Sequence, residues 1–262
     1  MSLACAIRYY GQHAHDLQQL RHAVIGASTY TNHVFIALNI TLDTINSIDI
    51  IQSWNISNLT IIQITNDIGV STTLNKLLLN AAQLNYDYIL YQSTEISINV
   101  SHIYTLQSYF DSLTLCVGVV LDGHTFISGI NILSGTTVPW NTCCIYHISS
   151  LLRTGFLTCT DGVSGCMYGV EELPCITLLQ LLSKQCNANT LSTDNQRHIA
   201  KLVRLDNIQW NTQYIDQHDR LSKHHAKIQS KYTRGQTTLQ LLGITSGTVL
   251  HIDHNDNAPY KQ

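Results

Sequence analysis

The chain has 262 residues, of which 44% are hydrophobic and 12% are charged, so it can bury a sizeable core and its composition argues against extensive disorder. Its formal net charge of −3 excludes the basic surface of a general nucleic-acid-binding protein, and we expect no nucleic-acid partner. No run approaches the roughly 18 apolar residues of a membrane-spanning helix.

The first half of the chain alternates apolar strands with amphipathic helices. Residues 2–10 and 33–40 are short runs rich in Ile, Tyr, Val and Ala, which is typical of strands. Between them, residues 15–28 place Leu17, Leu20 and Val24 at helical spacing. The alternation continues with a helix, a strand, a helix and a strand at residues 42–54, 58–65, 70–85 and 86–92. This pattern predicts crossover units and a mainly parallel sheet.

The second half continues the pattern less regularly. We expect a helix at residues 100–112, a strand at 113–121, turns and short strands at 122–140, a strand entering a helix at 143–156, and a helix at 170–185. The chain becomes more charged from about residue 218, where a surface helix at 218–232 and a tail are expected. The predicted organisation is one domain over residues 1–205, with halves at 1–98 and 99–205, followed by a C-terminal helical extension and tail at 206–262.

The eight cysteines include no CxxC pair, which argues against a zinc ribbon. The first residues lack the basic start of a secretory signal and are typical of a first strand. We therefore expect buried free thiols, and a protein located in the cytoplasm or at the cytosolic face of a membrane.

Three strand ends carry distinctive chemistry, and ligands of open α/β sheets bind outside such carboxyl ends. Tyr9 and Tyr10 follow the first strand and can stack on a flat base. Gly69, in "NDIGVSTTLNK", allows close backbone approach just before a helix N-terminus, where phosphate is stabilised. "YILYQSTEIS" ends a strand at the lone carboxylate Glu95, which is either a metal ligand or only the polar end of a buried strand.

The order of these motifs resembles the inverting family 2 glycosyltransferases. Asp67, Gly69 and Asn75 stand where that family has N-x-G-x(5)-N, and Ser93-Thr94-Glu95 stands where it has Asp-x-Asp. "VPWNTCCIYHISSLLRTGF" is similar to the acceptor-side segment. "YGVEELPCITLLQLLSKQ" is similar to the G-x-E-D motif at the head of a helix. The resemblance covers roughly residues 3–205.

The resemblance implies a GT-A fold of the α/β, Rossmann-like class, in which a mainly parallel central sheet is flanked by helices. It also implies transfer of a sugar, with inversion, from a nucleotide-diphosphate sugar to a hydroxyl acceptor on a glycan, a lipid-linked molecule or a polysaccharide, with peripheral membrane association as one setting. Glu172 matches the catalytic base, with Glu171 as second choice. Glu95 matches the ligand of Mn²⁺ or Mg²⁺. The implied donor-binding residues are Tyr9, Tyr10, Asn39, Asp67, Gly69, Asn75, Ser93 and Thr94.

Some positions depart from the family pattern or have simpler interpretations. The first strand ends in "RYYGQ" where the family has Pro-x-Tyr-Asn. After the second strand, where the family has an Asp-rich turn that contacts the base, this chain has "ALNITLD", in which Asn39 or Asp43 would fill that role. His198 is either a third metal ligand or a surface histidine. Glu171 and Glu172 are also what a helix N-terminus favours without any catalysis.

Two alternatives to the transferase remain. One is a catalytically inactive GT-A-like module that binds a glycan or a protein partner, which the reduced acidic motif favours. The other is a nucleotidyltransferase, which is disfavoured because no basic, glycine-rich loop follows the first strand.

Overall fold

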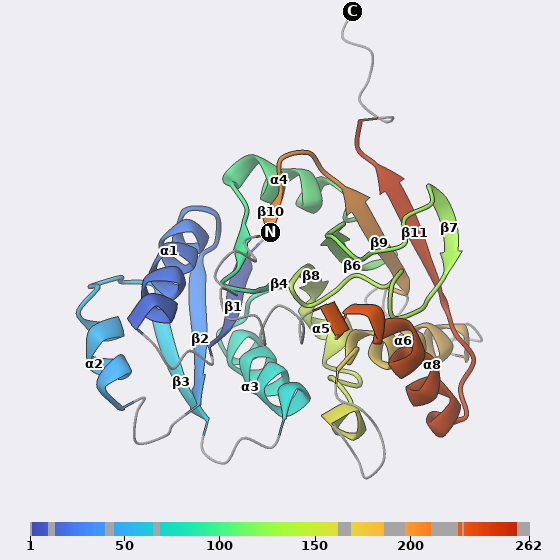
Figure 1. Cartoon of the computed structure of the whole chain (residues 1–262), viewed down its shortest axis with the longest axis horizontal. Helices are drawn as coiled ribbons and strands as arrows, with labels where there is room; N and C mark the ends of the chain where they lie inside the picture. Colours follow the sequence, from blue (N-terminus) through green and yellow to red (C-terminus); the bar gives the residue numbers. More distant parts are fainter. Residues whose placement is uncertain are drawn as a thin grey trace, which may run out of the picture.

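A nine-stranded sheet forms the centre of the computed structural model (Figure 1). The structure describes residues 2–9, 14–39, 45–64, 69–161, 169–185, 197–210, 225–226 and 228–255. The strands are β1 Leu3–Tyr9, β2 His33–Asn39, β3 Leu59–Ile64, β4 Tyr88–Gln92, β5 Ile96–Ser97, β6 Thr114–Val119, β7 Gly129–Ile132, β8 Cys143–His147, β9 Ile199–Arg204, β10 Gln209–Trp210 and β11 Thr248–Asp253. The helices are α1 Ala14–Tyr30, α2 Ile45–Gln52, α3 Val70–Gln83, α4 Val100–Ser108, α5 Ile148–Leu151, α6 Glu172–Gln185 and α8 Lys231–Leu242, with a 3₁₀ turn, η2, at Thr158–Asp161.

The strand order in the sheet is β3-β2-β1-β4-β8-β6-β9-β11-β7. Strands β3, β2, β1 and β4 pair in parallel, and so do β6, β9 and β11. Strand β8 runs antiparallel to both of its neighbours, and β7 runs antiparallel to β11. The predicted α/β fold with a mainly parallel sheet is therefore confirmed, and β4, β6, β9 and β11 all end at the same edge as β1.

Helices cover the sheet, and this explains the apolar composition of its strands. Helix α1 contacts α4 as well as β1 and β2, while α3 contacts α5 and η2, and α6 contacts α8. Figure 1 shows α1 and α4 on one side of the central strands and α3, α6 and α8 on the other. Strands covered on both faces are expected to be continuously apolar, as they are in residues 3–7, 34–38 and 115–117, all of them buried.

The C-terminal part differs from the predicted helical extension. Strand β11 lies inside the main sheet, between β9 and β7, and Val249 and His251 are buried there. Its backbone pairs in parallel with β9 on one side and antiparallel with β7 on the other. The helix expected at residues 218–232 falls largely outside the described residues, and the described helix α8 begins at Lys231.

The described cysteines are free thiols, and all but Cys159 are buried. The buried thiols are those of Cys5, Cys116, Cys143, Cys144 and Cys175. Burial raises the pKa of the Cys143 thiol to about 12, so it stays protonated at physiological pH. Cys166 and Cys186 lie outside the described residues. None of the described helices combines the length and the apolar character that crossing a membrane requires.

Candidate active site

The candidate site lies where the strand order of the sheet reverses. The chain runs outward from β1 to β2 and β3, then returns to add β4 on the other side of β1. Ligands of such sheets bind outside the carboxyl ends of the strands at this switch point. Arg8 and Tyr9 are at the end of β1, and residues 93–95 follow the end of β4, so the topology alone places these residues side by side.

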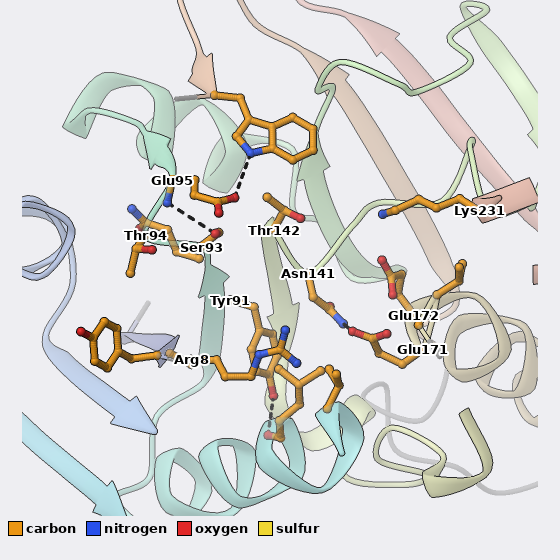
Figure 2. A pocket seen from close by; sticks show the side chains of 18 of the residues that line it. Arg8, Tyr91, Ser93, Thr94, Glu95, Asn141, Thr142, Glu171, Glu172 and Lys231 are labelled. Carbon is orange, nitrogen blue, oxygen red and sulfur yellow. Dashed lines mark hydrogen bonds between the residues drawn. The ribbon is translucent and has the colours of Figure 1, made fainter. Parts of the chain in front are cut away.

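A cavity of about 350 Å³ opens at this point, a size within the range of small-molecule sites. One side is formed by β1, α1 and the end of β4, and the other by the loop before β8, the start of α6, β10 and α8. The polar and aromatic residues that line it are Arg8, Tyr9, Asp16, Gln19, Tyr91, Gln92, Ser93, Thr94, Glu95, Asn141, Thr142, Glu171, Glu172, Trp210, Lys231 and Arg234. Figure 2 shows Arg8 and Lys231 pointing into it from opposite sides.

Glu95 is half-buried at the β4 side of the cavity. Its Oε2 accepts a hydrogen bond of 3.3 Å from the indole Nε1 of Trp210, and its backbone N–H donates to Ser93 Oγ at 3.4 Å (Figure 2). Trp210 reaches this position because β10 pairs with β5, where Trp210 lies opposite Ile96. The polar strand end is therefore a fixed carboxylate at the cavity wall.

Two adjacent carboxylates face the cavity from the start of α6. Glu172 is 3% exposed and Glu171 is 9% exposed, and Asn141 Nδ2 donates to Glu171 Oε1 at 3.4 Å. Burial, together with the charge of the neighbouring Glu171, raises the pKa of Glu172 to about 7, against the opposing effects of Lys231 and backbone N–H groups. Within the described part of the chain, Glu172 Oε2 is buried and makes no hydrogen bond.

A strained turn delivers these carboxylates. Gly169 and Val170 both have positive φ, of 96° and 70°. A β-branched residue rarely adopts this conformation, which costs on the order of 1–3 kcal/mol and is found mostly at functional sites. Gly169 is also close to Arg234, since a Cβ there would lie 2.7 Å from the guanidinium Nη1.

Two cations of α8 complete the wall beside the carboxylates. Lys231 Nζ lies 3.3 Å from the centroid of the Trp140 ring, which is stacked on His124 at 3.7 Å. Arg234 Nε donates to Ser230 Oγ at 3.0 Å. Burial lowers the pKa of Arg234, and the two glutamates oppose that shift. The Lys231 and Arg234 side chains are 9% and 6% exposed.

Several predicted residues do line the cavity. Tyr9, Ser93 and Thr94 are at its β1 and β4 side, as the predicted donor-binding role requires. Burial, together with the charge of Asp16, raises the pKa of Tyr9 to about 12, so the phenol stays protonated. Tyr10 and Asp67 lie outside the described residues.

Asn75 does not line the cavity but fixes a loop. Its Nδ2 donates to the Phe156 carbonyl and its Oδ1 accepts the Phe156 N–H, both at 2.8 Å. This side-chain amide thus pairs with the backbone just after α5, with both of its polar groups satisfied. The expected contact of Asn75 with the donor therefore does not fit the structure.

The N-terminus of α3 already has an anion, the side chain of Asp161. The Ser71 N–H donates to Asp161 Oδ1 at 2.8 Å, and a Cβ at Gly69 would lie 2.3 Å from the Asp161 carboxyl carbon. The glycine does allow close approach, but what approaches is the 3₁₀ turn η2. The expected phosphate contact at Gly69 is replaced by this internal cap.

His198 lies at the wrong edge of the sheet for a ligand shared with Glu95. It precedes β9, whereas Glu95 follows β4, and these two strands run in the same direction. A strand of this length separates the two edges by about 20 Å, far beyond the reach of one ion. Asn39, at the end of β2, is half-buried and does not line the cavity.

Several cavity residues escaped the motif comparison. Arg8 and Asn141 belong to segments whose other residues carry the resemblance, Lys231 belongs to a charged stretch typical of a surface helix, and Trp210 and Arg234 match no motif. Lys201 and Arg204, basic residues near the same end of the chain, instead pair with Asp111 and Asp253. The charge of a side chain therefore does not tell the basic residues that line the cavity from those that pair elsewhere.

No protein-family model matches the chain, and no curated protein matches it in sequence. Several solved structures do match the chain in fold. The mannosyltransferase PcManGT from Pyrobaculum calidifontis, in complex with GDP-Man and Mn²⁺, aligns with a TM-score of 0.51 at 11% identity, over 70% of this chain and 52% of that one. TarS 1-349 of S. aureus in complex with UDP-GlcNAc gives a TM-score of 0.44 at 13% identity, over 75% and 69%. GalNAc-T7 with UDP, GalNAc and Mn²⁺ gives 0.46 at 11%, over 63% and 38%.

The alignment with PcManGT confirms the predicted fold: the chain has a GT-A-type glycosyltransferase fold. This chain spans about half the length of PcManGT. At this level of identity the likeness establishes the fold alone, so activity has to be argued from the cavity.

Proposed function

We propose that the chain transfers a sugar from a nucleotide-diphosphate sugar to a hydroxyl acceptor, with inversion and with Glu172 as the catalytic base. The observation that carries this proposal is Glu172 Oε2, a buried carboxylate oxygen in the cavity that has no hydrogen-bond partner among the described residues. Leaving such an atom without a partner costs stability unless a ligand supplies one. The GT-A fold supports the choice of substrate class.

The proposed reaction needs one proton acceptor on the acceptor side of the sugar. Glu172 Oε2 takes the proton of the acceptor hydroxyl as the hydroxyl oxygen attacks the anomeric carbon of the donor. The bond between that carbon and the diphosphate oxygen breaks, and its electron pair leaves with the nucleoside diphosphate. A base with a pKa of about 7 is ionised in sufficient amount near neutral pH and still accepts a proton readily.

The cavity lining supports one orientation of the donor. The nucleoside would lie beside Tyr9, Asp16 and Gln19, at the end of β1 and near the start of α1, where an aromatic ring is available. The diphosphate and sugar would then lie between the end of β4 and the start of α6. The acceptor, a glycan or a lipid-linked molecule, would enter on the side of Asn141 and the two glutamates.

The residues present do not fit a protein-held Mn²⁺ or Mg²⁺. Glu95 is a single carboxylate, one of its oxygens already accepts the Trp210 indole N–H, and its neighbour Ser93 is neutral. A cation such as Mg²⁺ takes about six oxygen ligands, and this strand end supplies one carboxylate oxygen besides the one bonded to Trp210. Among the described residues, no three His, Cys, Asp or Glu side chains form a group that could hold an ion.

The test is a donor screen by mass spectrometry, with UDP- and GDP-sugars, for hydrolysis or transfer. We expect Glu172→Gln to lose turnover by at least about a hundredfold, since general base catalysis contributes 10²–10⁴-fold, while donor binding is nearly intact. Glu171→Gln is the matched control, one residue away with the same change, and should lose less.

Full activity of Glu172→Gln would refute the base assignment. No turnover of any donor, together with no nucleotide binding, would instead favour the inactive module that binds a glycan or a protein partner.

A further inference from the structure

Three cationic side chains converge on the cavity from separate parts of the chain. Arg8 comes from the end of β1, and Lys231 and Arg234 come from the first turn of α8. Lys231 and Arg234 are three residues apart, so they project from one face of the helix. Both are more than nine-tenths buried, which is uncommon for lysine and arginine and places their charges in the wall of the cavity.

The two cations of α8 are held in place before any ligand arrives. The Trp140 ring has Lys231 on one face and His124 on the other, and Trp140 Nε1 donates to the Gly135 carbonyl at 2.9 Å. Helix α8 also packs very closely on the core, since a Cβ at Gly135 would lie 1.9 Å from the Lys231 carbonyl oxygen. A charge fixed in this way stabilises a bound anion without a further loss of side-chain entropy.

The acidic residues of the cavity balance part of this positive charge. Glu171 and Glu172 interact favourably with Arg234, and Glu95 lies across the cavity at the β4 side. A nucleotide diphosphate would add negative charge between Glu95 and α8, and this charge grows as the sugar leaves. Guanidinium groups bind phosphate oxygens in a bidentate manner, and an ammonium acts as a point charge.

We infer that Arg8, Lys231 and Arg234 bind the diphosphate of the donor directly, so that donor binding does not require a divalent metal ion. The inference rests on the proposed function and specifies how its donor is held. It follows from the disagreement between the single carboxylate at the end of β4 and the three cations around the same cavity.

The direct test is calorimetric titration of the full chain with UDP and with GDP, in EDTA and separately in Mn²⁺. We expect the dissociation constant of the better nucleotide to differ by less than about threefold between the two conditions. The reason is that the three cationic side chains already neutralise the negative charge of the diphosphate. Binding that occurs only with Mn²⁺ would overturn the inference and leave the proposed function standing. Absence of binding in both conditions would overturn both.

Substitutions then assign the contacts. Arg8→Gln, Lys231→Gln and Arg234→Gln should each weaken binding in EDTA roughly tenfold, as expected for one hydrogen bond to a charged group. Arg204→Gln is the matched control: this arginine pairs with Asp253, does not line the cavity and should leave binding unchanged. Unchanged affinity in all three cavity variants would overturn the inference.

Two further variants guard against misleading results. Lys231→Arg keeps the charge and should retain binding, so a loss in Lys231→Gln alone reports charge rather than packing; thermal melts establish that each variant is folded. Glu95→Gln should bind the nucleotide in EDTA at least as tightly as the wild type, because an anion near the diphosphate is removed. Loss of binding in Glu95→Gln would show that this carboxylate holds a required cation, against the inference.

Discussion

Glu172 should reduce the stability of the fold at neutral pH, and Glu172→Gln should restore part of it. Burial and the nearby Glu171 raise the pKa of Glu172 from 4.5 to about 7. Between these values the carboxyl group is ionised in the unfolded chain but protonated in the folded one. The sign is therefore unfavourable: the penalty is absent below pH 4.5, grows as the pH rises, and is complete above pH 7.

The size of the penalty follows from the shift. A difference between 4.5 and about 7 corresponds to about 3 kcal/mol in the free energy of unfolding at high pH. Since a domain is typically stable by only about 5–15 kcal/mol, this is a measurable fraction. The gain in Glu172→Gln is at most this large, because the buried amide also needs hydrogen-bond partners.

Urea unfolding of the wild type and of Glu172→Gln at pH 5, 6, 7 and 8 measures the effect. The difference in unfolding free energy should increase in favour of the variant across this range and level off above pH 7. A difference that stays constant from pH 5 to 8 would show that Glu172 is not protonated in the fold, and the reasoning from burial would be refuted.

Three further predictions concern other positions. Asn75→Ala removes both hydrogen bonds to Phe156, so it should destabilise the fold by about 1–3 kcal/mol in urea unfolding while leaving the nucleotide affinity unchanged, whereas a donor-binding role predicts weaker affinity. Hydrogen bonds from Ser2 lower the pKa of Asp87 below 3.8, so Asp87→Asn should be less stable than the wild type above that pH. The difference in stability should disappear as the pH falls through the lowered pKa. A pH series of thermal melts checks this sign, which is opposite to that expected for Glu172. Gly169→Ala forces a Cβ into a backbone with φ of 96° and against an arginine of α8, so it should destabilise by about 1–3 kcal/mol and reduce turnover; unchanged melting would contradict the strained turn.

The fold was largely predictable because its strands and helices alternate with clear periodicities. The strands at residues 3–9 and 33–39 are apolar runs, and Leu74, Leu77 and Leu78 form the buried face of α3. Strands β9 and β11 escaped prediction because each mixes charged or histidine residues with apolar ones. The buried Lys201 of β9 donates to Asp111 and to the Tyr109 carbonyl, and both partners are distant in sequence.

The part of the candidate site that could be predicted lies at the ends of strands and the starts of helices. Glu95, Glu171 and Glu172 line the cavity because strand ends and helix starts are positions that a sequence reveals. Asn75 and Gly69 matched a motif, but their contacts with Phe156 and Asp161 depend on tertiary packing. Lys231 and Arg234 could not be assigned, because only the docking of α8 against the core shows which charges are buried.

The position of β11 has a consequence for how the site forms during synthesis. Strand β7 pairs only with β11 in the described sheet, and α8, which carries the cavity cations, immediately precedes β11. The edge of the sheet and one wall of the cavity therefore form only after α8 and β11 have been synthesised, about a hundred residues after β7. The N-terminal crossover units can fold on the ribosome while the cavity is still open on this side, and ligand binding can report the last folding step.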